Sequence, residues 1–120
     1  MAKPGEPHVK YDIQDLGDYL VVHLSGDVDL YSSPHAREVI LNCLDQNKNL
    51  LIEMSGVVYI DSSGVASLVE GYQISKNKNL EFGLVSVSEN AINVLQLAHL
   101  DKVFPIHDSL EAKLQSGNAE

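Results

Sequence analysis

The segment that decides the fold runs Tyr59-Ile60-Asp61-Ser62-Ser63-Gly64-Val65-Ala66. An apolar segment over residues 57–60 leads into it. Beyond it, apolar residues recur with the spacing of one helix face, at Val65, Leu68, Val69 and Tyr72. The sequence therefore predicts a helix that begins at the two serines, after an apolar segment that ends at Ile60.

Strands and helices also alternate on both sides of this segment. Residues 9–15 and 19–24 are typical of two strands joined by a Gly17-Asp18 turn, which makes an opening hairpin. Polar residues 26–29 break the chain before a helix that begins near Ser32 or Ser33. The remaining predicted elements are a strand at 50–54, the helix from the serines, a strand at 80–87, a helix capped by Ser88, an edge strand at 103–106, and a short terminal helix with Asp108 and Glu111 as a capping box. This order predicts an α/β fold with a mixed sheet, opened by a β-hairpin, and about four helices.

The composition is that of one folded domain. The chain has 120 residues, of which 44% are hydrophobic and 21% charged, and this length supports one hydrophobic core. We expect a flexible N-terminal lead-in over residues 1–7, the folded domain over 8–116 and a tail over 117–120. The single cysteine, Cys43, excludes an intramolecular disulfide, and its place on an apolar helical face predicts a buried thiol.

The charge and hydropathy exclude several classes of partner. A formal net charge of −9 repels phosphate backbones and anionic headgroups, so we expect no direct contact with nucleic acid or membranes. No run approaches the roughly 20 apolar residues of a membrane-spanning helix, and the N-terminus lacks the apolar core of a leader peptide. The sequence therefore predicts a cytoplasmic protein.

Ser62 is the residue on which chemistry is expected. A serine in the first turn of a helix lies near unpaired backbone N–H groups and the positive end of the helix dipole, which favour an attached phosphate. A serine here can equally be a plain N-cap, and Asp61 can be a cap or a solvated loop carboxylate. Gly64 permits a close approach of another backbone. From spacing alone, the capping role and the phosphate-accepting role both stay open.

The chain resembles the STAS domain of bacterial anti-sigma factor antagonists. The resemblance spans nearly the whole sequence and rests on the opening hairpin, on Gly26-Asp27-Val28-Asp29 before a capped helix, and on Ile60-Asp61-Ser62-Ser63-Gly64 before an amphipathic helix. It implies a regulatory protein without catalytic residues, metal or cofactor of its own.

The resemblance also implies a mechanism. Ser62 matches the serine that is phosphorylated by a kinase that is also the anti-sigma factor. The unphosphorylated antagonist binds that kinase and releases a sigma factor, and a metal-dependent serine phosphatase removes the phosphate. Asp29 matches an acidic position near the phosphosite, and with Asp61, Ser63 and Gly64 it completes the expected partner-binding set.

Three other interpretations are open at this stage. A STAS domain can serve a different assembly, such as a transporter or a stress complex. A phosphoaspartate receiver domain would use Asp61 as its acceptor, with Asp27 and Asp29 as a metal-binding pair. A hydrolase is disfavoured because the nucleophile elbow needs a glycine two residues before the serine, where this chain has Ile60, and because the scattered histidines form no triad or metal-binding motif.

Residues 57–59 could form an exposed partner patch, but we assign them to packing.

Overall fold

The computed structural model describes residues 9–118. The elements follow in the order β1 (Val9–Asp15), β2 (Tyr19–Val28), α1 (Ser33–Leu44), β3 (Asn49–Ile60), α2 (Ser62–Asn77), β4 (Phe82–Val85), α3 (Glu89–Leu97), β5 (Ile106–His107) and α4 (Leu110–Asn118). The predicted lead-in over residues 1–7 lies outside the described part of the chain. Residues 117–118, assigned to a tail, form the end of α4.

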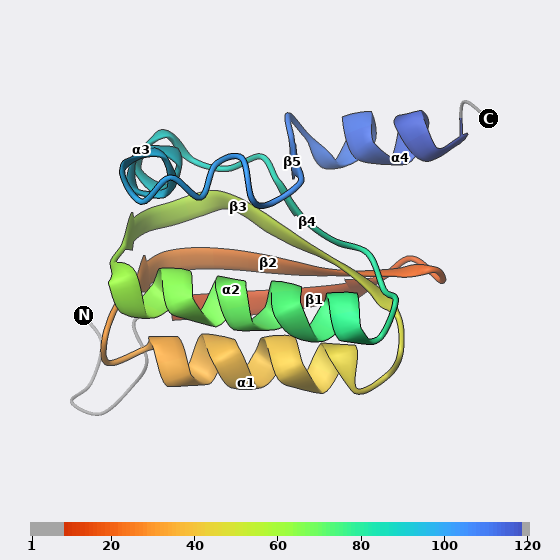
Figure 1. The fold of residues 1–120 in the computed structure, drawn as a ribbon, viewed down its shortest axis with the longest axis horizontal. Coiled ribbons are helices and arrows are strands. Elements are labelled where there is room, and N and C mark those ends of the chain that lie inside the picture. The colour runs from red at the N-terminus through yellow and green to blue at the C-terminus, as the bar shows by residue number, and fades with distance from the viewer. Residues whose placement is uncertain (1–8, 119–120) are drawn as a thin grey trace.

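The strands form one sheet in the order β1-β2-β3-β4-β5. β1 pairs with β2 antiparallel, and the other neighbours are parallel. Figure 1 shows α1 and α2 side by side along one face of this sheet, with α4 on the opposite face. α3 lies near the end of β3, and its buried residues Ala91 and Leu95 belong to the same core cluster as those of α1 and α2. The predicted α/β fold, with a mixed sheet opened by a hairpin and four helices in the described residues, is confirmed.

The core lies between the sheet and the pair α1–α2. Alternate residues of β2 and β3 point into it, because successive side chains of a strand face opposite ways. The face of α1 that meets them is buried, including the predicted thiol of Cys43, and this burial raises the pKa of that thiol. A smaller apolar cluster on the opposite face of the sheet consists of Val21, Leu51 and Val85, with Leu110 of α4 packed against it.

Several predicted boundaries are wrong, each for a local reason. Residues 26–28 do not break the chain; they continue β2 through a register shift, with Gly26 at φ 87°. β4 is only four residues long, and Ser86, directly after it, has a positive φ of 52°. The last strand begins at Ile106 instead of Val103, because pairing starts only at the Pro105 carbonyl, which accepts from the Leu84 N–H at 2.9 Å.

The short strand predicted at 50–54 is longer than expected, because β3 continues through the apolar segment 57–60 to Ile60. The cap of α4 is also displaced by one residue from the predicted capping box. The Ser109 hydroxyl accepts the Ala112 N–H at 3.0 Å, in place of the expected bond from the Glu111 N–H to the Asp108 side chain. The capping role of Ser88 is confirmed by its bond from the Ala91 N–H.

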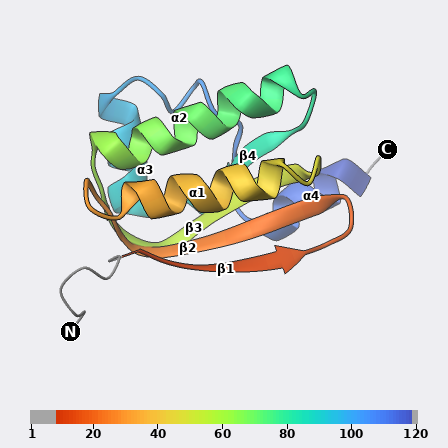
Figure 2. The ribbon, with the colours of Figure 1, turned by 90° about the horizontal axis from the view of Figure 1, so that it is seen from below.

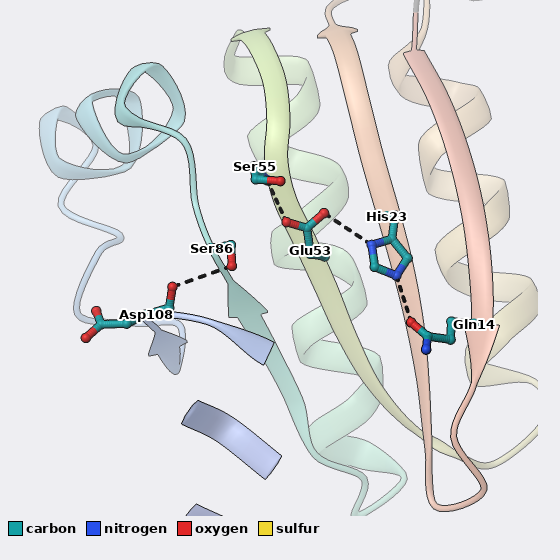
Figure 3. A network of polar contacts seen from close by, with 6 residues as sticks. All are labelled: Gln14, His23, Glu53, Ser55, Ser86 and Asp108. Atoms are coloured by element: carbon teal, nitrogen blue, oxygen red, sulfur yellow. Dashed lines mark hydrogen bonds and ion pairs between the residues drawn. The ribbon is translucent and has the colours of Figure 1, made fainter. Parts of the chain in front are cut away.

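The face of the sheet away from α1 and α2 carries a chain of polar side chains (Figure 3). His23 on β2 lies with Nδ1 3.2 Å from Glu53 Oε1 on β3, and with Nε2 3.0 Å from Gln14 Oε1 on β1. The Ser55 N–H donates to the other oxygen of Glu53 at 3.1 Å. These contacts tie the three strands together on the open face.

No helix within residues 9–118 is long and apolar enough to cross a membrane.

Candidate functional site

The parallel register of β2 and β3 brings the predicted site residues together. Val28 pairs with Ile60, so the next residues, Asp29 and Asp61, leave the sheet at the same edge. Figure 1 shows that α1 and α2 also begin at this edge. Segments about thirty residues apart in sequence therefore meet at the carboxyl ends of two neighbouring strands.

Asp61 is the N-cap of α2 and also binds the loop before α1. Its Oδ1 accepts the N–H of Ser63 at 2.9 Å and the N–H of Gly64 at 3.2 Å. Its Oδ2 accepts the N–H of Leu30 at 3.1 Å. Both oxygens are thus engaged by backbone donors, and the half-buried carboxylate fixes the start of α2 against the β2–α1 loop.

Asp29 holds the same β2–α1 loop through bonds within the loop itself. Its Oδ1 accepts the N–H groups of Tyr31 and Ser32, at 3.1 and 3.0 Å, in a local side-chain-to-backbone turn. The completely buried Ser32 hydroxyl donates to the Asp27 carbonyl at 2.6 Å and accepts the Asp29 N–H at 3.0 Å. The loop that precedes α1 is therefore held in one conformation by its own polar groups.

Ser62 is the first residue of α2, and its side chain is exposed. Its hydroxyl makes no hydrogen bond to any of the described residues, so the N-cap role that the sequence left open belongs to Asp61. Ser63 is half-buried, and its carbonyl accepts the Ser67 hydroxyl at 3.3 Å. The Ser67 hydroxyl also lies 3.3 Å from the Ser33 carbonyl, which joins the first turns of α1 and α2.

Gly64, in the first turn of α2, is buried against β2 and β3. A Cβ at this position would lie 2.5 Å from the Val28 carbonyl oxygen and 2.7 Å from Ile60 Cγ1, distances that real Cβ atoms do not reach. The absence of a side chain lets α2 begin directly against β2 and β3. Gly64, predicted as a partner contact, is buried and seats the first turn of α2, which carries Ser62, against the two strands.

Four large apolar side chains are exposed beside these polar residues, and we call them the apolar rim. Its exposed fractions are 65% for Leu30, 83% for Tyr31, 62% for Val58 and 51% for Tyr59. The assignment of residues 57–59 to packing is correct for Val57, which is 2% exposed, and wrong for the other two. Exposed apolar side chains that gather at one edge mark an interaction surface.

Sequence reasoning missed the contribution of Leu30 and Tyr31. The available signal was a pair of large apolar residues inside a loop that is otherwise polar, between a strand and a helix cap. The bridge between α1 and α2 was missed as well. Arg37 donates to both carboxylate oxygens of Glu70, at 2.6 and 2.7 Å, about one turn beyond Ser33 in α1 and Ser67 in α2.

The geometry argues against the receiver interpretation. Residues 9–118 begin with an antiparallel hairpin at the sheet edge, where a receiver would begin with a central parallel strand. Asp27 lies within β2, and within the described residues no group of three His, Cys, Asp or Glu side chains could hold a metal ion. What this site offers chemically is one exposed serine hydroxyl, that of Ser62, at the start of a helix and beside the apolar rim.

Comparison with known proteins agrees with this architecture. A family model described as the STAS domain matches residues 10–113. The anti-sigma-B factor antagonist of Bacillus subtilis (strain 168) is 25% identical over 108 residues, covering 90% of this chain and 99% of that protein. The anti-sigma F factor antagonist of Paenibacillus polymyxa is also 25% identical, over 75% of this chain and 79% of that protein. The crystal structure of an anti-sigma factor antagonist from Mycobacterium paratuberculosis shares the fold, with a TM-score of 0.80, 24% identity and 97% of each chain covered.

Proposed function

The chain belongs to the STAS domain family, and we propose that it is an anti-sigma factor antagonist whose binding to the anti-sigma factor is controlled by phosphorylation of Ser62. The observation that carries this proposal is the exposed Ser62 hydroxyl at the edge where Asp29, Asp61 and the apolar rim meet. A kinase needs such an accessible hydroxyl, and a protein partner needs such an apolar surface.

In the unphosphorylated protein, the apolar rim and the first turn of α2 would contact the anti-sigma factor. The Leu30 N–H binds Asp61, and Val58 and Tyr59 precede Asp61 closely in the chain, so a partner that covers the rim would also lie close to Ser62. Among the predicted contact residues, Ser63 is half-buried, and Asp29 and Asp61 shape the surface through their backbone bonds. Binding releases the sigma factor that the anti-sigma factor would otherwise hold.

Phosphorylation of Ser62 would weaken the binding of the partner and leave the fold of this chain unchanged. The N–H groups of Ser63 and Gly64, which could hold a phosphate at a helix N-terminus, already bind Asp61. A phosphate on Ser62 would therefore stay at the surface and bring about −1.5 to −2 charges into the interface. The desolvation of this phosphate, its bulk and the negative charge that it adds to that of Asp29 and Asp61 all oppose docking of the anti-sigma factor. A tenfold loss of affinity needs only about 1.4 kcal/mol.

The remaining chemistry belongs to the partners. The kinase would be the anti-sigma factor itself and would supply ATP, Mg²⁺ and the catalytic base. A metal-dependent serine phosphatase would restore the hydroxyl. This chain contributes the acceptor and the recognition surface, and needs no catalytic residue or cofactor. The cytoplasmic location predicted from the sequence is consistent with this function and stays a prediction.

Two substitutions at Ser62 test the proposal. Ser62→Ala should bind the anti-sigma factor constitutively and accept no phosphate, whereas Ser62→Asp should bind at least about tenfold more weakly. Ser55→Ala and Ser55→Asp, at an exposed serine of β3 outside the predicted partner-binding set, are the matched controls. The measurements are calorimetric binding to the purified anti-sigma factor, and peptide mass spectrometry after incubation with that protein and ATP.

The outcomes separate the candidate functions. Phosphate on Ser62 together with weaker binding of Ser62→Asp supports the switch. Equal binding of the Ala and Asp variants removes Ser62 from the mechanism and favours a STAS module of another assembly. A hydroxylamine-labile phosphate on Asp61 would point to an acyl phosphate instead.

A further inference from the structure

The edge strand β1 carries a pattern that the proposed function does not use. In residues 9–118, β1 pairs with β2 alone, and Figure 2 shows its outer side directed away from the other strands and from α1. The strand is seven residues long and contains no proline. Its outer row of backbone N–H and C=O groups is therefore a template for another strand.

The two faces of β1 differ in chemistry. Val9 reaches the core and the Tyr11 ring lies 5.1 Å from the ring of His35 on α1, so the odd-numbered residues face α1. Tyr11 and Ile13 are nevertheless 43% exposed each, since α1 does not extend over the edge. Lys10 and Asp12 face the open side together with Gln14, which contacts His23.

We propose that β1 pairs antiparallel with β1 of a second copy of this chain, with Tyr11 opposite Tyr11. In this register each Lys10 lies opposite an Asp12 of the other copy, so two pairs of opposite charge form on the open face. On the α1 side, the two Tyr11 rings meet, and each Val9 lies opposite an Ile13. Aromatic, aliphatic and opposite-charge pairs are the cross-strand neighbours that stabilise antiparallel sheets.

Neighbouring registers are disfavoured by charge. A shift that keeps the same faces aligned moves the pairing by two residues. One such shift places Lys10 opposite Lys10, and the other places Asp12 opposite Asp12. The pattern of this strand thus selects one register, and a two-fold pairing of identical edges closes as a dimer without leaving a further edge of β1 free.

The interface is small, and we expect weak association, with a dissociation constant on the order of 0.1 mM. At a salt concentration of about 0.15 M, the electrostatic repulsion between two chains of net charge −9 is screened beyond a distance of about 8 Å. Ser62 lies on the far side of β2 from this edge, so dimerisation does not depend on the proposed switch.

Charge exchange tests the register. Sedimentation equilibrium of the full chain from about 10 µM to 1 mM should show a shift from 13.1 kDa toward twice that mass. Lys10→Asp and Asp12→Lys should each stay monomeric, since each places like charges opposite. The double variant K10D/D12K should dimerise again, and an equimolar mixture of the two single variants should form a heterodimer.

Lys102→Asp, at an exposed site after α3, repeats the charge change of Lys10→Asp away from the edge and should dimerise like the parent chain. Ser62→Asp should do the same, which separates this proposal from the phosphorylation switch. A parent chain that stays monomeric at 1 mM, or single variants that associate as well as the parent, would overturn the proposal.

Discussion

At the scale of single residues, Asp61 explains why a short polar motif can define a recognition surface. Its carboxylate caps α2 through two N–H groups and holds the Leu30 backbone through a third. Leu30 and Tyr31 are thereby fixed next to Ser62, although they come from a different connection. A loop whose backbone is already fixed loses less conformational entropy on binding than a mobile one, which suits Leu30 and Tyr31 to the proposed role of the apolar rim.

The apolar rim can be tested with one truncation and one matched control. Leu30→Ala should weaken binding to the anti-sigma factor about tenfold, because interface anchors typically contribute more than 1 kcal/mol. Leu97→Ala makes the same change at an exposed leucine at the end of α3 and should leave binding unchanged. Both side chains are largely exposed, so neither variant should unfold at a lower denaturant concentration than the parent chain. Equal affinities of the two variants, measured by titration calorimetry, would exclude Leu30 from the interface.

Gly64 gives a second prediction at this scale. Gly64→Ala should destabilise the fold by about 1–3 kcal/mol, because the added methyl group collides with the Val28 carbonyl and the Ile60 side chain. The neighbouring substitution Ser63→Ala keeps the existing Cβ and should cost clearly less. Urea unfolding curves measure the difference. If Gly64→Ala unfolds at the same urea concentration as Ser63→Ala, α2 is not seated as tightly on the strands as the structure indicates.

At the scale of elements, the N-caps of two helices should differ in their contribution to stability. Ser88 caps α3 with one bond from the Ala91 N–H, so Ser88→Ala should cost about 1 kcal/mol. Asp61 accepts two N–H groups of α2 and one from the β2–α1 loop, so Asp61→Ala should cost about 2 kcal/mol or more. The free energies of unfolding of both variants give the comparison. A smaller loss for Asp61→Ala than for Ser88→Ala would contradict the bridging role.

The elements also show what the sequence could predict. The hairpin, α1, α2 and α3 follow from local periodicity and capping residues, and the resemblance assigned Ser62 because a contiguous motif carries it. The bond from Leu30 to Asp61 could not be predicted, since it depends on the parallel register that pairs Val28 with Ile60. The exposure of Val58 and Tyr59 was missed for a similar reason. Their burial depends on whether α3 extends over the end of β3, and local pattern does not carry that information.

At the scale of the whole molecule, α4 is joined to the sheet by a polar cluster at the end opposite to Ser62. The Tyr19 hydroxyl donates to Glu81, and Lys113 of α4 lies 3.2 Å from the same carboxylate. These bonds, the one from Tyr19 first, lower the pKa of Glu81. Burial, and then the charge of Lys113, lower the pKa of nearby His107 on β5. Both groups therefore link the folding of the C-terminal part to pH.

The direction of each effect on stability follows from which state binds more protons. The unfolded chain protonates His107 near its ordinary pKa of 6.5, before the folded chain does, so stability should fall as pH drops below that value. Glu81 behaves likewise below its ordinary pKa of 4.5, and its contribution is fully present only above that pH. Acidification should thus destabilise the molecule in two steps, with His107 contributing to the first and Glu81 to the second.

The substitution His107→Asn should remove its share of the first step and leave the second. The observable is the slope of the unfolding free energy against pH, from urea titrations between about pH 7.5 and 3. His99→Asn is the matched control, because His99 is exposed with a positive φ of 60°, which asparagine tolerates. The His107 variant should lose less stability than the control between about pH 7 and 5, whatever its absolute stability. Parallel curves for the two variants over that interval would mean that His107 takes up its proton equally in the folded and unfolded chain, and that the loss arises elsewhere.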